Sequence, residues 1–129
     1  MTPSVLAAAS AGDPNAFDGT RDPLAATFIF DGGEFTVINN HLTDRFGSTP
    51  VFGGPQPFVQ ASESQREAQA QALNDYVDSL LGVDDDERVI VLGDLNTFEF
   101  TNDVTEILPG TGSEKVLTNL IDSLSDDNV

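Results

Sequence analysis

The chain of 129 residues allows one domain at most, and 22 acidic against five basic side chains give it a formal net charge of −17. This balance excludes a basic nucleic-acid-binding surface of the ordinary kind and disfavours docking on anionic lipid. The absence of cysteine excludes disulfides and thiol catalysis, and the single histidine, His41, means that two-imidazole chemistry needs a second histidine from elsewhere.

Residues 1–20 are expected to be an irregular segment, because they show no clear hydrophobic period. The next stretch predicts a β-hairpin, since Leu24 to Phe30 is rich in β-branched and aromatic residues. Asp31-Gly32-Gly33 supplies the positive φ angles of a tight turn, and Phe35 to Asn40 is then the returning strand. Alternate residues of the returning strand should face opposite sides of the sheet.

A long irregular loop is expected over His41 to Gln60, which is rich in glycine and proline. Loops of this length inside compact domains usually carry function or are disordered. Ser62 and Gln65 have the spacing of a capping box, so a helix should begin at Ser62 and end at the cap residue Gly82. Its buried stripe is predicted to consist of apolar residues at helical spacing: Ala68, Leu73, Tyr76, Val77, Leu80 and Leu81.

The remaining elements are a strand and two helices. Asp84 to Glu87 is expected to be an exposed acidic turn, and Arg88 to Leu92 predicts a strand that is buried on both faces. Asn102 or Thr101 is expected to cap a short helix that runs through Leu108. A last helix is predicted from apolar residues at helical spacing: Val116, Leu117, Leu120, Ile121 and Leu124.

The most informative motif is Gly93-Asp94-Leu95-Asn96, at the end of the predicted buried strand. Ligands of α/β folds collect outside strand ends, where side chains from several strands converge. Asp94 offers oxygen to Mg²⁺ or to a proton, and Asn96 offers a donor and an acceptor to a phosphate or a water. An Asp/Asn turn that merely closes the strand is the alternative interpretation.

Two further residues are candidates for the same chemistry. His41 ends an apolar strand and begins the long loop, where an imidazole is well placed to donate to a phosphoryl oxygen or to assist proton transfer. Arg21 precedes the first predicted strand and offers a planar fork to phosphate. The alternatives are a structural or merely exposed His41, and an Arg21 that pairs with Asp18 or Asp22.

Four segments, in this order, resemble the endonuclease/exonuclease/phosphatase superfamily, which has the deoxyribonuclease I-like fold. They are Thr20 to Phe28 (TRDPLAATF), Val37 to Leu42 (VINNHL), Ser64 to Ala70 (SQREAQA) and Val89 to Asn96 (VIVLGDLN). The Gly-Asp-x-Asn tetrapeptide alone is weak evidence for this superfamily. The four segments in this order are more specific evidence. More narrowly, the set is similar to large secreted bacterial nucleases of that superfamily, over most of residues 20–124.

The resemblance implies a partial four-layer α/β sandwich, with a mixed or antiparallel sheet and flanking helices. It also implies hydrolysis of phosphate esters supported by Mg²⁺, or by Ca²⁺ or Mn²⁺ in its place. Arg21 and Asn96 would bind the substrate phosphate, and His41 would be one of the family's two active-site histidines. Asp94 would orient or deprotonate the attacking water or hold the metal, so the catalytic residues implied are His41, Asp94 and Asn96.

Two parts of the family's site have no counterpart in these segments. The family's metal-binding Glu lies on an earlier strand, and its late Asp-His pair would follow near Val129. Residues 21–129 are therefore expected to be a partial domain, preceded by the irregular residues 1–20. The remainder of the catalytic domain is expected to be missing, and the isolated fragment is expected to be inactive.

The expected function is that of a metal-dependent phosphodiesterase, most simply an extracellular endonuclease that acts on DNA or RNA. The alternatives are a phosphatase or sphingomyelinase-type phosphodiesterase of the same fold, and a non-catalytic acidic extracellular module. The acidic surplus is typical of high solubility or of a saline setting, where screening makes self-repulsion tolerable. No membrane partner is expected, and residues 5–11 lack the basic flank of a signal peptide.

Overall fold

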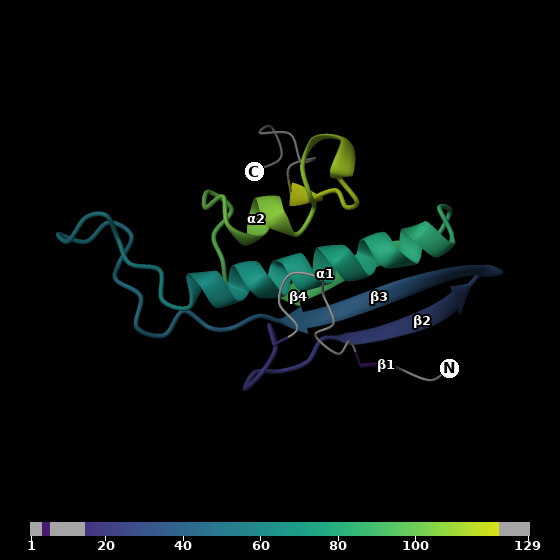
Figure 1. Cartoon of the computed structure of the whole chain (residues 1–129), viewed down its shortest axis with the longest axis horizontal. Helices are drawn as coiled ribbons and strands as arrows, with labels where there is room; N and C mark the ends of the chain where they lie inside the picture. The colour runs from purple at the N-terminus through teal and green to yellow at the C-terminus, as the bar shows by residue number, and fades with distance from the viewer. Residues whose placement is uncertain (1–3, 6–14, 122–129) are drawn as a thin grey trace.

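The computed structural model describes Ser4–Val5 and residues 15–121, which form a mixed β-sheet with flanking helices (Figure 1). The strands, in the sheet order β1-β2-β3-β4, are β1 (Ser4–Val5), β2 (Leu24–Phe30), β3 (Gly33–His41) and β4 (Val89–Asp94). The helices are α1 (Glu63–Val83), the single turn α2 (Val104–Ile107) and the 3₁₀ turn η1 (Gly112–Glu114). Strand β2 is antiparallel to β1 and β3, whereas β4 runs parallel to β3. The expected α/β class is confirmed.

The predicted hairpin is present, and strand β2 has the predicted bounds. Phe30 pairs with Gly33, so Asp31 and Gly32 form a two-residue turn. Their φ angles are 49° and 77°, and two consecutive positive values match the right-handed twist of the flanking strands. Strand β1 lies within the stretch expected to be irregular and pairs with the start of β2.

Helix α1 lies along one face of the sheet, and Figure 1 shows residues 42–62 as a long loop that extends beyond the end of β3. Thr36, Ile38 and Asn40 of β3 are buried, as alternation along the strand predicts. The core between helix and sheet is formed by apolar residues: Ala25, Ile38, Leu42, Ala70, Leu73, Val77, Val104 and Leu108. Among the described residues, no helix is both long and apolar enough to cross a membrane.

Ser62 is the N-cap residue of α1, as predicted, but the capping box does not form, and the predicted C-terminal cap Gly82 is wrong. Ser62 has a φ of 59° and makes no side-chain cap bond, because a capping side chain needs an extended backbone to reach the first turn. The helix continues through Gly82 to Val83, and the backbone N–H of Asp84 still donates to Leu80. Asp84 is therefore the residue that ends the helix.

Strand β4 is not buried on both faces, contrary to the prediction from its continuous apolar run. Val89 and Val91 pack against the core, whereas Ile90 and Leu92 are 47 % and 45 % exposed. The alternation follows from the position of α1, which covers one face of the sheet. Within residues 15–121 the opposite face keeps apolar side chains exposed, among them Leu24, Phe28, Ile90 and Leu92.

The C-terminal elements differ most from the prediction. Helix α2 follows Asp103 rather than Thr101 or Asn102, because Asp103 Oδ1 accepts the Thr101 hydroxyl at 2.9 Å and keeps that residue outside the helix. The last predicted helix is absent from the described residues up to Ile121, and Leu124 lies outside them. The N–H groups of Val116 and Leu117 both donate to the Pro109 carbonyl, which folds this segment back onto the core.

Candidate active site

The parallel strands β3 and β4 place two predicted site residues opposite each other. His41 is the last residue of β3, Asp94 is the last residue of β4, and the two are register partners. The carboxyl ends of parallel strands meet at one edge of a sheet, which is where α/β proteins bind ligands. Their side chains are 44 % and 61 % exposed, so both are open to a ligand.

Gly93 makes this pairing possible by allowing a close approach of β4 to β3. Its φ is 125°, and it pairs with Asn40. A Cβ atom on Gly93 would overlap the carbonyl oxygen of Asn40 and would lie 2.7 Å from the Asn40 nitrogen. Glycine is therefore required by the geometry that brings Asp94 beside His41. Buried Asn40, which the sequence prediction missed as a support, donates through Nδ2 to Leu92 at 3.0 Å and fixes β4.

Arg21, His41 and Asp94 form a chain of polar contacts. Arg21 Nη1 lies 2.5 Å from His41 Nδ1 and 3.3 Å from Nε2. His41 Nε2 lies 3.9 Å from Asp94 Oδ2. The three predicted residues come from the segment before β2 and from the ends of β3 and β4, so the fold brings them together from distant parts of the sequence.

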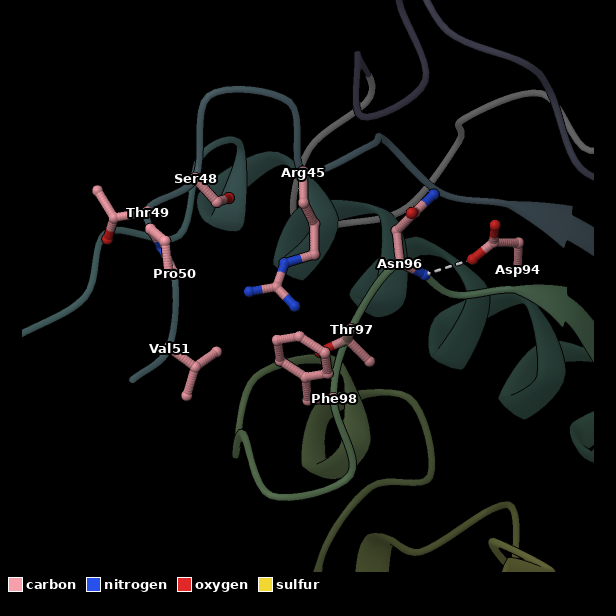
Figure 2. A pocket seen from close by; sticks show the side chains of 9 residues that line it. All are labelled: Arg45, Ser48, Thr49, Pro50, Val51, Asp94, Asn96, Thr97 and Phe98. Carbon is pink, nitrogen blue, oxygen red and sulfur yellow. Dashed lines mark hydrogen bonds between the residues drawn. The ribbon is translucent and has the colours of Figure 1, made fainter. Parts of the chain in front are cut away.

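Asn96 completes this group through the backbone. Its φ is 50°, and its N–H donates to Asp94 Oδ1 at 2.9 Å, which fixes that carboxylate (Figure 2). The side-chain Nδ2 donates to the Leu42 carbonyl at 2.9 Å, directly after His41. One amide hydrogen and the amide oxygen of Asn96 have no partner in these contacts, so the side chain keeps capacity for a ligand.

The arginines beside this group are not neutralised by the many acidic residues of the chain. Within residues 15–121, neither Arg21 nor Arg45 forms an ion pair with a carboxylate, so the alternative pairing of Arg21 with Asp18 or Asp22 is not observed. Acidic side chains outnumber basic ones by 22 to five, and cations left without a carboxylate are therefore noteworthy. Such cations favour binding of an anionic ligand.

Two hollows flank the His41–Asp94 pair. Arg21 and His41 line one of about 570 Å³, together with residues that include Asp18 and Gln65. Asp94 and Asn96 line the other, of about 420 Å³, whose opposite wall belongs to the long loop (Figure 2). The candidate catalytic group therefore lies between two spaces, each large enough for part of a substrate.

The sequence prediction missed Arg45 and Phe98, which line the second hollow. The Arg45 guanidinium lies 3.9 Å from the centre of the Phe98 ring, and Figure 2 shows it pointing into the space beside Val51. Phe98 stacks on Phe100, with ring centres 5.0 Å apart. The available signal was positional, because Arg45 lies in the Gly/Pro-rich loop and Phe98 follows Asn96 by two residues.

Two buried polar residues of α1 hold the site segments, and the sequence prediction missed both. Gln69 Oε1 accepts from the Thr43 N–H at 2.9 Å, and its Nε2 donates to the Thr20 hydroxyl at 3.1 Å. Gln69 therefore joins the residue before Arg21 to the start of the long loop. The signal was the helical period, since positions 66, 69, 70, 73 and 77 form one stripe that faces the core.

Arg66 ties the same helix to the long loop. Its Nη1 donates to the carbonyls of Asp44 at 3.1 Å and Ala61 at 2.7 Å, and lies 3.4 Å from that of Thr43. Burial of the guanidinium lowers the pKa of Arg66, and the charge of Asp103 opposes this shift. Arg66 therefore fixes the base of the loop that carries Arg45.

The donor set near Asp94 fits a hard divalent cation only in part. Mg²⁺ is usually held by one or two carboxylates together with waters and substrate phosphate, and Asp94 supplies one carboxylate, with the Asn96 amide oxygen beside it. In the part of the chain that the structure describes, the one group of three metal-ligating side chains is Asp84, Asp85 and Asp86. This acidic turn is exposed, as predicted, and it lies outside the strand ends that carry the site.

Comparison with known proteins identifies the family. The model of the endonuclease/exonuclease/phosphatase family matches residues 5–128, and the chain belongs to this family. Its members are hydrolases of the phosphoesterase and nuclease type, and the predicted superfamily is confirmed. Searches of curated proteins and of solved structures give no match.

Proposed function

We propose that this domain is a metal-dependent phosphodiesterase that hydrolyses the phosphodiester bonds of nucleic acid outside the cell. The observation that supports this most strongly is the contact chain from Arg21 through His41 to Asp94, with Asn96 beside it. A cation, an imidazole, a carboxylate and an amide at one sheet edge supply the groups that phosphoryl transfer to water needs.

Arg21 is the residue that binds the phosphate. Its guanidinium holds His41 through one nitrogen and keeps its remaining N–H groups for the non-bridging phosphate oxygens. The free amide hydrogen of Asn96 donates to the same group. These donors act on the non-bridging oxygens, which carry the negative charge while the bond to the attacking water forms and the bond to the leaving oxygen breaks.

Asp94 orients the attacking water and takes a proton from it. Oδ1 is fixed by the Asn96 N–H, and Oδ2 remains open toward His41. As the oxygen of the water bonds to phosphorus, one of its protons passes to Oδ2, the bond from phosphorus to the leaving oxygen breaks, and that oxygen is then protonated from solvent. The Nε2–H of His41 donates to a phosphoryl oxygen beside the carboxylate.

A divalent cation, Mg²⁺ in the first place and Ca²⁺ or Mn²⁺ as alternatives, would be held by Asp94 and the Asn96 amide oxygen. When bound it would neutralise charge on the phosphate and polarise the attacking water. Because only Asp94 and Asn96 would supply protein ligands, most coordination positions of such a cation would be filled by waters and by the substrate.

We also propose that residues 21–129 form part of a larger catalytic domain. The support is the sheet face opposite α1, which keeps Leu24, Phe28, Ile90 and Leu92 partly exposed, whereas an apolar sheet face is normally covered by a second layer. A second layer would also bring further acidic and imidazole groups to the strand ends. The acidic surplus supports an extracellular, saline location, where screening weakens repulsion between the chain and a polyanion.

A substrate panel tests this proposal, with the complete domain assayed beside the 129-residue chain. The substrates are DNA, RNA, sphingomyelin vesicles and an inositol phosphate, each with Mg²⁺ and with a chelator. The proposal predicts chelator-sensitive cleavage of nucleic acid by the complete domain, and binding without turnover by the chain alone. Turnover of only sphingomyelin or inositol phosphate would contradict the nuclease assignment while it left the hydrolase class intact.

A further inference from the structure

We propose that the hollow lined by Arg45 and Phe98 is a subsite for the nucleobase next to the scissile phosphate. This inference rests on the proposed function, and it specifies the substrate as nucleic acid with an accessible base, such as a single strand or a strand end. Arg45 and Phe98 are then the residues that determine specificity, whereas Arg21 and Asp94 serve the phosphate itself.

The position of the hollow supports this assignment. It shares Asp94 and Asn96 with the candidate catalytic group, and its far wall comes from the long loop, which includes Pro50 and Val51 (Figure 2). A phosphate held at Arg21 and Asp94 would therefore place its flanking nucleoside in this space. The hollow is open to solvent, and its volume of about 420 Å³ leaves room for a base at the surface.

The chemistry of the hollow suits an aromatic base. Guanidinium planes and aromatic rings are the two surfaces on which proteins stack unpaired bases, and here Arg45 already lies over the Phe98 ring at 3.9 Å. Phe98 is 38 % exposed and is itself supported by stacking on Phe100. The geometry therefore presents a prearranged stacking surface beside the reacting group.

Arg45 also retains hydrogen-bonding capacity for a ligand. Within residues 15–121 it forms no ion pair with a carboxylate, and Figure 2 shows the terminal nitrogens of its guanidinium in the open space of the hollow. The N–H groups of the guanidinium match the carbonyl oxygens and ring nitrogens on the edge of a base. A planar ligand with acceptor atoms therefore fits this residue.

The neighbouring hydroxyl groups are already engaged within the protein. Ser48 Oγ accepts from the Ala61 N–H at 2.9 Å, and Thr49 Oγ1 accepts from the Val59 N–H at 2.7 Å. Thr97 Oγ1 donates to a buried carboxylate at 2.6 Å. These bonds fix the walls of the hollow, on which Arg45 and Phe98 provide the planar surfaces.

The same geometry disfavours the other substrates of this fold. The quaternary ammonium of a choline headgroup binds to an open aromatic face, but the Phe98 face is occupied by the Arg45 cation, which would repel it. An inositol ring is not aromatic and gains little from a stacking surface. A nucleobase can stack on the Arg45 guanidinium, which the Phe98 ring supports from below, so it is the ligand that the hollow favours.

Binding of labelled oligonucleotides to the full chain, measured by fluorescence anisotropy, tests the proposal. A short single-stranded oligonucleotide is compared with an abasic one of the same length, which keeps the sugars and phosphates but lacks the bases. We expect the base-bearing strand to bind about tenfold more tightly, as one stacked base commonly contributes. Phe98→Leu and Arg45→Lys should each remove most of this difference, so that each weakens the base-bearing strand more than the abasic one.

The controls separate stacking from charge and from folding. Both substitutions preserve the net charge, so long-range repulsion of the strand stays the same. Phe52→Leu is the matched control, because Phe52 is 98 % exposed on the same loop and does not line the hollow. Circular dichroism checks that each variant is folded. If Phe98→Leu does not fold, the binding measured with Arg45→Lys decides whether the hollow is a base subsite.

Equal binding of the two strands, or equal weakening of both by Phe98→Leu, would overturn the subsite and leave the phosphate site standing. Failure of both strands to bind would instead contradict the proposed function, and the subsite with it. Sphingomyelin vesicles form a third arm of the experiment. Vesicle binding that depends on Phe98, without base-dependent oligonucleotide binding, would overturn the proposal in favour of a lipid substrate.

Discussion

Arg21 and His41 are twenty residues apart in the sequence, and Arg21 Nη1 lies 2.5 Å from His41 Nδ1. An arginine only donates hydrogen bonds, so Nδ1 is the acceptor in the tautomer that fits this shorter contact. Its proton is then on Nε2, the nitrogen that lies 3.9 Å from Asp94 Oδ2. The arginine thereby sets the tautomer of the histidine as well as offering charge to a phosphate.

The first prediction concerns this tautomer. Nitrogen-15 chemical shifts of the His41 ring at neutral pH should show the proton on Nε2, because Arg21 occupies Nδ1. Arg21→Met removes the donor, so we expect a mixture of the two tautomers. Arg88→Met removes an exposed arginine elsewhere and should leave the spectrum unchanged. A ring protonated on Nδ1 in the unmodified protein would contradict the geometry of the site.

The second prediction concerns the close approach of β4 to β3. Gly93→Ala should lower the free energy of unfolding by about 3 kcal/mol, because a Cβ at a positive φ is strained and would overlap the Asn40 carbonyl. Urea denaturation measures the change. The substitution should also displace Asp94 from His41 and disturb their paired resonances.

Gly82→Ala is the matched control for that substitution. Gly82 lies inside α1, and a Cβ there meets no atom within 4 Å. Alanine should therefore raise the free energy of unfolding by about 0.5–1 kcal/mol, because it is the better helix former. If both glycine variants had similar stabilities, Gly93 would not be the constrained position that the strand pairing describes.

The third prediction concerns the anchor of the long loop. Arg66→Met would leave the carbonyls of Asp44 and Ala61 without their donor, and it should cost about 2–3 kcal/mol, as expected for loss of hydrogen bonds to a charged group. Limited proteolysis should then cut the loop faster than in Arg88→Met. An unchanged cleavage rate would show that Arg66 does not hold the loop.

Local chemistry explains which parts of the fold were predictable. The hairpin follows from β-branched strands around Asp31-Gly32, whose positive φ angles are a local requirement. Helix α1 was placed by its period and begins after the predicted N-cap residue Ser62, yet the capping box does not form because the Ser62 backbone is left-handed. The absent last helix shows the same limit, since contacts of Val116 with Pro109 override its apolar spacing.

The candidate site was also predictable from the sequence only in part. Arg21, His41, Asp94 and Asn96 were predicted from motifs, and the sheet brings them to one edge. Their roles remain predictions until variants are assayed. Arg45 and Phe98 were not predictable as a pair, because only the folded loop brings residues from two distant segments into contact.

The most direct test of the proposed function is cleavage of nucleic acid by the complete domain in the presence of Mg²⁺, compared between Asp94→Asn and Asp85→Asn. Both substitutions remove one exposed carboxylate, but only Asp94 lies beside His41 and Asn96. We expect Asp94→Asn to lower the cleavage rate by about 10²–10⁴-fold, the usual contribution of a positioned general base, and Asp85→Asn to retain it. Full activity of Asp94→Asn, or equal loss in both variants, would contradict the assignment of this strand edge as the active site.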